Sequence, residues 1–243
     1  MTKLKCKVVS IKSINNTVYR VLLLPQGQFS FLAGQYLMLI IDEYNQRPFS
    51  IASIPSEKKT IELHISASRF HLYGIEVMKI IYKKNSINID IPYGKAWFRE
   101  GSKKPMIIIT GGTGFSYTQS ILHAALKENP NREITFYWGS RQLENLYYLN
   151  ELKYLSKKYA NLNIIFVIEE YISHWTGRRG TVLNAVLNDF NKLTQYEIYI
   201  AGSFKMAKTT RECLCNERGA IAKYCYGDAF ESFLITSETN QSI

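Results

Sequence analysis

The sequence lacks the cysteine and histidine patterns that mark redox centres and metal sites. Its four cysteines form no CxxC pair and no cluster, which argues against an attached iron–sulfur domain. Its four histidines show no HxxxH or HExxH spacing, so no metal is expected. The opening residues, MTKLKCKVVS, lack the apolar core of a signal peptide, and with the cysteine usage this predicts a reducing cytoplasm.

Long apolar runs and strong charge blocks are also missing. The longest apolar run, Val21–Leu24, is far below the roughly 20 residues that span a bilayer, so no membrane partner is expected. Lys and Arg outnumber Asp and Glu by 30 to 20, giving a net charge of +10. The basic residues gather only in pairs, without a tail or stripe, so no nucleic-acid partner is expected. A biased coding composition explains the excess, and small phosphorylated ligands would also fit it.

The first hundred residues are typical of antiparallel β-structure, because short strand-forming runs alternate with turn-forming segments. The expected strands are Cys6–Ile11, Thr17–Leu24, Gln35–Ile41, Pro48–Ala52, Thr60–Ile65 and Ile87–Ile91. Apolar residues at near-helical spacing predict one helix, Leu72–Tyr82, before the last strand. Strands with this spacing predict an antiparallel barrel or sandwich.

After the polar stretch Arg99–Lys104 the pattern changes, so residues 1–100 and 104–235 are expected to form separate domains. Expected strands in the second domain are Met106–Thr110, Ile134–Trp138, Ile164–Ile168, Ile198–Ala201 and a final segment, Tyr224–Tyr226. Expected helices are Ser116–Glu128, Asn145–Tyr159, Thr181–Phe190 and Lys205–Glu217. Apolar strands alternating with amphipathic helices predict a parallel sheet covered on both faces. The polar residues 236–243 are expected to be a disordered tail.

A glycine turn links the first strand of the second domain to its helix. Gly111, Gly112, Thr113 and Gly114 follow the apolar run directly. Glycines let a backbone approach a pyrophosphate, and the helix N-terminus attracts an anion. Tyr117 stands where GxGxxG has its third glycine, so these residues also fit a turn that only closes the crossover.

The next strands end in similar small residues. Ser140 and Arg141 follow Gly139, and Gly202 follows the strand ending at Ala201. An acidic side chain after Gly139 would bind the ribose diol and repel a 2′-phosphate. Ser140 and Arg141 would not, so we expect NADPH to be accepted beside NADH, although a solvated Arg at a strand end fits equally.

In the first domain, the segment Arg47-Pro48-Phe49-Ser50 carries the residue types that a flavin ring needs. Such a ring requires an apolar wall, a hydrogen-bond donor at N5 and dipoles near its carbonyl oxygens. Pro48 fixes the backbone, Ser50 supplies a hydroxyl and Arg47 a cation. By residue type alone the segment also fits an ordinary edge strand.

Six segments in order, RPFS, LHISAS, GGTGFSY, YWGSR, AGSFKMAK and YGDAF, resemble the ferredoxin–NADP reductase superfamily. Within it the chain is most similar to the bacterial NAD(P)H-dependent flavin reductases that use free flavin, including those of luminous bacteria. The resemblance runs from Cys6 to about Phe233. It implies a six-stranded antiparallel flavin barrel, a C-terminal Rossmann-like α/β nucleotide domain and an active site in the cleft between them. A monomer is expected.

The resemblance also implies roles for individual residues. It sets Arg47, Pro48, Phe49 and Ser50 against the isoalloxazine, with His64 and Ser66 at the border of the site. It assigns the pyridine nucleotide to Gly111, Gly112, Thr113 and Gly114, assisted by Ser140, Arg141 and Gly202 and capped by Met206. The implied reaction passes a hydride from nicotinamide C4 of NADH or NADPH to flavin N5, with the Ser50 hydroxyl near N5 as the catalytic group.

One departure from the superfamily concerns the segment that binds FAD. Members that retain FAD carry a glycine and a Ser or Thr after the fifth strand, whereas this chain has Ser66–His71 there. Flavin is therefore expected to exchange as a substrate, whether riboflavin, FMN or FAD, and to pass electrons to ferric complexes, an oxygenase or oxygen. Two alternatives stay open: a reductase with fixed FAD that serves a protein partner, and a non-enzymatic nucleotide-binding module.

Overall fold

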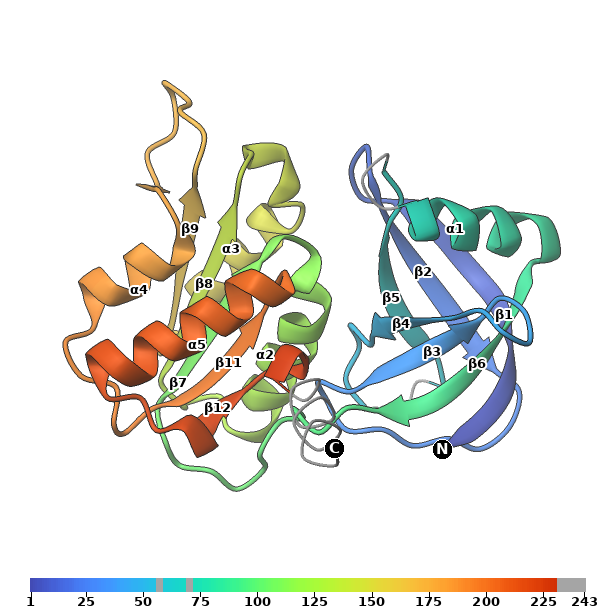
Figure 1. The fold of residues 1–243 in the computed structure, drawn as a ribbon, viewed down its shortest axis with the longest axis horizontal. Coiled ribbons are helices and arrows are strands. Elements are labelled where there is room, and N and C mark those ends of the chain that lie inside the picture. Colours follow the sequence, from blue (N-terminus) through green and yellow to red (C-terminus); the bar gives the residue numbers. More distant parts are fainter. Residues whose placement is uncertain (56–58, 69–71, 231–243) are drawn as a thin grey trace, which may run out of the picture. The chain divides into compact units, whose positions relative to one another are not determined.

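A computed structural model describes residues 1–55, 59–68 and 72–230, in two compact units (Figure 1). The first unit comprises Met1–Phe98 and Gln119–Ala124, and the second comprises Arg99–Thr118 and the chain from Ala125 onward. The expected tail, residues 236–243, lies outside the described residues. Among the helices of the described ranges, none has the length and apolarity needed to cross a membrane.

The first unit is built on one antiparallel sheet of six strands in the order β4-β3-β6-β1-β2-β5. The strands are β1 (Thr2–Ser13), β2 (Val18–Pro25), β3 (Tyr36–Ile40), β4 (Gln46–Ser50), β5 (Ile61–Ser66) and β6 (Ser86–Tyr93). The backbone N–H of Ala52, just after β4, donates to the carbonyl of Glu62 in β5 at 2.9 Å, which links the two edges of the sheet. The sheet is thus a nearly closed barrel, and the expected barrel is confirmed.

The barrel core follows the period of two that a pleated strand imposes. Along β5, Ile61, Leu63 and Ile65 belong to the buried core, while Glu62 and His64 lie on the opposite face. Helix α1 (Leu72–Lys84) adds Val77, Met78 and Ile81 to the same core, so its apolar stripe is buried as its spacing predicts.

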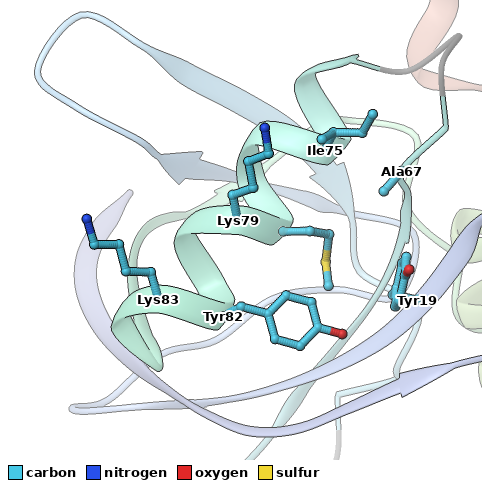
Figure 2. Close-up of a pocket in the computed structure, with 7 residues that line it drawn as sticks. Tyr19, Ala67, Ile75, Lys79, Tyr82 and Lys83 are labelled. Atoms are coloured by element: carbon cyan, nitrogen blue, oxygen red, sulfur yellow. The ribbon is translucent and has the colours of Figure 1, made fainter.

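An open groove of about 540 Å³ lies beside α1. It is lined by Tyr19, Ala67, Ile75, Met78, Lys79, Tyr82 and Lys83. Figure 2 shows the Tyr82 ring reaching toward Tyr19, whereas the Lys79 and Lys83 ammonium groups extend away from the helix. None of the residues expected to bind flavin or nucleotide lines this groove.

The second unit contains a parallel sheet in the order β10-β9-β8-β7-β11-β12. Its strands are β7 (Met106–Gly111), β8 (Ile134–Ser140), β9 (Leu162–Ile168), β10 (Arg178–Arg179), β11 (Glu197–Ala201) and β12 (Cys225–Tyr226), and its helices are α2 (Phe115–Glu128), α3 (Leu149–Lys158), α4 (Val182–Asp189) and α5 (Phe204–Arg218). The order runs outward from β7 in both directions, so the topological switch point lies between β7 and β11. Ligands bind at such points in open α/β sheets.

Three local features differ from the expected elements. Strand β1 begins at Thr2 instead of Cys6. Helix α3 begins at Leu149 instead of Asn145, after a 3₁₀ turn, η2 (Leu143–Asn145). The Tyr147 and Tyr148 rings pack against Phe115 with centroids 5.6 and 5.4 Å away, and this aromatic packing takes the place of a first helical turn. Strand β10 was not expected, because two consecutive arginines carry no strand signal.

Candidate active site

The expected glycine turn joins β7 to α2 through a 3₁₀ turn, η1 (Gly112–Gly114). Gly112 has φ of +53°, and a Cβ there would meet nothing within 4 Å. A Cβ on Gly114 would instead lie 2.7 Å from the carbonyl carbon of Ala201. No side chain caps the N-terminus of the 14-residue helix α2. A half-buried glycine backbone that leads into a helix end without a side-chain cap fits a pyrophosphate.

The exits of β7 and β11 lie against each other at the switch point. A Cβ on Gly111 would stand 3.6 Å from the Cα of Gly202, and a Cβ on Gly202 only 2.7 Å from the Met206 sulfur. The structure therefore brings together Gly111, Gly202 and Met206, which are up to 95 positions apart in the sequence numbering. Met206 is held by Ser203, the N-cap of α5, whose hydroxyl accepts a hydrogen bond from the Met206 N–H at 3.3 Å.

Ser203 was not among the expected site residues, although a Ser just before a helical run is an N-cap signal. It sits directly after Gly202, at the carboxyl edge of the sheet. Its cap fixes the first turn of α5 beside the glycine turn.

The β8 exit lies beside the glycine turn, because Gly139 pairs in register with Gly111. A Cβ on Gly139 would come within 2.7 Å of Val182 in α4, so the packing of that helix requires glycine here. Ser140 is buried, whereas 78% of the Arg141 side chain is exposed. The Arg141 Nε donates to the carboxylate of Glu170 at 2.9 Å. Sequence reasoning missed Glu170, because its position beside Arg141 follows from strand order.

The flavin residues expected on β4 lie on both of its faces. Phe49 is 8% exposed, belongs to the barrel core and packs at 6.2 Å against the Tyr73 ring. Its ring thus faces the core and lies on the side of β4 away from the outer surface. Pro48 is exposed and Ser50 half-buried, on the opposite side of the strand from Phe49. Arg47 is half-buried, and one of its guanidinium nitrogens lies 3.5 Å from the Gln46 carbonyl.

His64 and Ser66 share the outer face of β5 with Glu62. The His64 side chain is fully buried and its Nε2 lies 3.0 Å from Glu62 Oε1, while Arg20 donates to Glu62 Oε2 at 2.5 Å. Burial by itself would raise the pKa of Glu62, but hydrogen bonds and charge from His64 and Arg20 outweigh it and lower the pKa to about 2. The carboxylate is therefore ionised throughout the physiological range. Because its side chain is fully buried, His64 contacts Glu62 and is not exposed on the outer surface.

Two polar residues from the middle of α2, which belong to the first unit, complete this outer face. Gln119 lies 3.4 Å from Glu62 Oε1 and 3.3 Å from the Ala52 carbonyl, and Ser120 donates to the Ser53 carbonyl at 2.8 Å. Sequence reasoning missed both, although they lie in the polar run Thr118-Gln119-Ser120 of this helix.

The FAD-anchor segment and the metal-ligating side chains are described only in part. Ser66 is described, but Arg69, Phe70 and His71, which complete the segment lacking an FAD anchor, lie outside the described residues. Across the ranges that the structure covers, His, Cys, Asp and Glu side chains form no group of three that would hold a metal ion.

Comparison with known proteins agrees with this architecture. Residues 108–212 match the family model of the oxidoreductase NAD-binding domain. The chain is 40% identical over 232 residues to an NAD(P)H-flavin reductase of Vibrio harveyi, covering 93% of this chain and 98% of that protein. Identity and coverage are the same for an NAD(P)H-flavin reductase of Aliivibrio fischeri. This chain belongs to the NAD(P)H-flavin reductase family.

Solved structures place this flavin reductase family member in the same fold class as larger reductases. A cytochrome P450 reductase from Amycolatopsis superposes with a TM-score of 0.84 at 22% identity, covering 93% of this chain and 69% of that one. The ferredoxin reductase of carbazole 1,9a-dioxygenase gives a TM-score of 0.82, also at 22% identity, over 94% of this chain and 69% of its own. The expected fold, a flavin-type barrel followed by a Rossmann-like domain, is confirmed.

Proposed function

We propose that this protein oxidises NADH or NADPH and reduces free flavin, with riboflavin, FMN and FAD as exchangeable substrates. One observation carries the proposal: the glycine exits of β7 and β11 adjoin at the switch point, under Met206, in a member of the flavin reductase family. The nicotinamide supplies a hydride that the flavin ring accepts, and such a reaction needs little beyond positioning of the two rings.

The chain's own residues supply that positioning. Gly111, Gly112 and Gly114 let the backbone meet the pyrophosphate, whose charge the N-terminus of α2 stabilises. On the barrel, Pro48 and Ser50 offer a flat edge and a hydroxyl on one face of β4. The Ser50 hydroxyl orients the flavin by a hydrogen bond at N5, and Arg47 complements the polar edge of the ring.

Flavin exchange separates this proposal from a reductase with a fixed FAD. Affinity that comes from the ring and ribityl chain alone does not distinguish riboflavin from FMN or FAD strongly. Protein purified without added flavin should therefore lose its yellow colour on gel filtration. Retention of one FAD per chain through that step would favour the alternative in which electrons pass to a protein partner.

The decisive experiment is anaerobic oxidation of NADH and NADPH with riboflavin, FMN and FAD varied separately. Turnover that depends on added riboflavin and saturates with it supports the proposal. Absence of turnover with every flavin, together with salt-sensitive retention of RNA, would overturn it in favour of a non-enzymatic nucleotide-binding module.

The proposal includes a monomer that works in a reducing cytoplasm. The four cysteines, Cys6, Cys213, Cys215 and Cys225, are free, which fits a reducing compartment. Light scattering on the eluting protein gives the oligomeric state, and a mass of 28.1 kDa is expected for the monomer.

A further inference from the structure

The carboxyl end of β9 brings an acidic side chain to the place where the nucleotide's adenosine ribose is expected. Because β8 and β9 pair in parallel, with Ser140 opposite Ile168, the residues that follow them remain neighbours. The Glu170 N–H donates to the Arg141 carbonyl at 3.0 Å, and the Glu170 carboxylate accepts from the Arg141 Nε at 2.9 Å. A backbone hydrogen bond and a side-chain ion pair therefore both hold Glu170 beside Arg141.

The ion pair with Glu170 changes the charge and the hydrogen-bond donors that Arg141 presents to a ligand. A lone guanidinium beside the ribose would favour a 2′-phosphate, because Arg binds phosphate through paired hydrogen bonds. Glu170 neutralises that charge and occupies one of its donors. The Glu170 side chain is 39% exposed, so its carboxylate stays accessible to a hydroxyl and repels a phosphate placed next to it.

From this geometry we infer that Glu170 is a specificity-determining residue that biases the enzyme toward NADH. The inference rests on the proposed function, since it assumes that the β8 exit receives the adenosine ribose. With NADH, the Glu170 carboxylate accepts a hydrogen bond from the ribose hydroxyl. With NADPH, the 2′-phosphate has to displace Glu170 from Arg141 and bear its repulsion.

A second cation in the region provides a matched control. Arg179, on β10 beside β9, lies over the Tyr171 ring at 4.4 Å and donates to the Ile172 carbonyl at 3.1 Å. Its side chain is thus engaged within its own loop. Glu169, the exposed neighbour of Glu170, bonds Ser140 through its backbone N–H and provides the matched acidic control.

The test compares kcat/KM for NADPH and NADH, with riboflavin as acceptor, in single and double variants. Glu170→Gln should raise the NADPH-to-NADH ratio about three- to tenfold, the size expected when a partly exposed ionic contact changes. The gain should shrink at high salt. Adding Arg141→Ala to Glu170→Gln should abolish it, whereas adding Arg179→Ala should leave it in place, and Glu169→Gln should not change the ratio.

An unchanged ratio in Glu170→Gln, or a gain that survives Arg141→Ala and disappears with Arg179→Ala, would overturn the inference. Binding of 2′,5′-ADP and of ADP, measured by calorimetry, gives a readout without turnover: Glu170→Gln should tighten 2′,5′-ADP selectively. If no variant oxidises NADH with flavin while this binding pattern holds, the proposed reaction fails and the specificity role stands. If turnover is normal and 2′,5′-ADP affinity does not change, the role of Glu170 fails alone.

Discussion

The indole N–H of Trp138 donates a hydrogen bond to the carbonyl oxygen of Gly112 at 3.2 Å. The same indole stacks on the Phe115 ring with centroids 4.1 Å apart and planes within 5°. Trp138 is in β8, whereas Gly112 is in the turn after β7 and Phe115 begins α2. The neighbouring strand thus supports the glycine turn through a hydrogen bond and a ring stack.

Replacing Trp138 with Phe should loosen this turn. The variant keeps an aromatic ring for the stack with Phe115 but leaves the Gly112 carbonyl without its donor, at a cost of about 1–3 kcal/mol in unfolding free energy. We expect the KM for NADH to rise several-fold while the KM for riboflavin stays unchanged in steady-state assays. Tyr199→Phe is the control: it removes a hydroxyl that accepts from the Arg99 N–H at 2.9 Å and should lower stability without changing the KM for NADH.

Gly114→Ala adds only one methyl group, but it should lower both stability and NADH affinity. The added Cβ would lie 2.7 Å from backbone atoms of Ala201 and Gly202, which cannot rotate away as a side chain would. The exits of β7 and β11 would be forced apart, costing about 1–3 kcal/mol in stability and most of the affinity for NADH. Urea unfolding and NADH titration measure the two effects.

The matched control is Gly101→Ala, where φ is +75° and nothing lies within 4 Å. It should cost about 1–2 kcal/mol through backbone strain alone and leave nucleotide affinity intact. Equal losses of NADH affinity in the two variants would contradict the close-approach role of Gly114.

Ser50→Ala tests the proposed catalytic hydroxyl. Because Ser50 is on the half-buried outer face of β4 and not in the core, its loss should leave the fold intact. We expect kcat to fall about tenfold or more, with a much smaller change in flavin KM, as for a group that acts mainly in the transition state. Ser50→Thr should restore most of the rate. A normal kcat in Ser50→Ala would remove this residue from the mechanism.

Acid should unfold the barrel partly through Glu62. Its pKa is about 2 in the folded protein against an ordinary value of 4.5, so ionised Glu62 stabilises the fold fully above pH 4.5. That contribution is lost as the pH falls from 4.5 toward 2. Glu62→Gln should remove this part of the acid dependence and lower stability at neutral pH by about 1.5–3 kcal/mol, the range for hydrogen bonds to charged groups.

Urea unfolding at several pH values measures the effect of Glu62. Glu76→Gln, an exposed carboxylate on α1, serves as the control and should keep the wild-type acid dependence. If Glu62→Gln loses stability with acid as steeply as the wild type between pH 4.5 and 2, the contacts with Arg20 and His64 do not lower its pKa as the structure implies.

Local signals in the sequence located most elements to within a few residues. Expected Met106–Thr110 is observed as β7 (Met106–Gly111), and expected Leu72–Tyr82 as α1 (Leu72–Lys84). These signals succeed because a strand buried on both faces appears as a continuous apolar run and an amphipathic helix as apolar residues at helical spacing. They failed at α3, whose first turn is displaced by the packing of Tyr147 and Tyr148 on a distant ring.

The sequence by itself determined the two kinds of sheet, the glycine turn and the family, because these depend on residue types at fixed spacing. Only the tertiary structure decided that Phe49 faces the core, that His64 is buried against Glu62, and that Glu170 neutralises Arg141. The burial of Phe49 and His64 depends on what covers each face of the strand. The contact of Glu170 with Arg141 depends on which strands are neighbours and on their register. No local pattern encodes that order, since it results from the packing of the whole sheet.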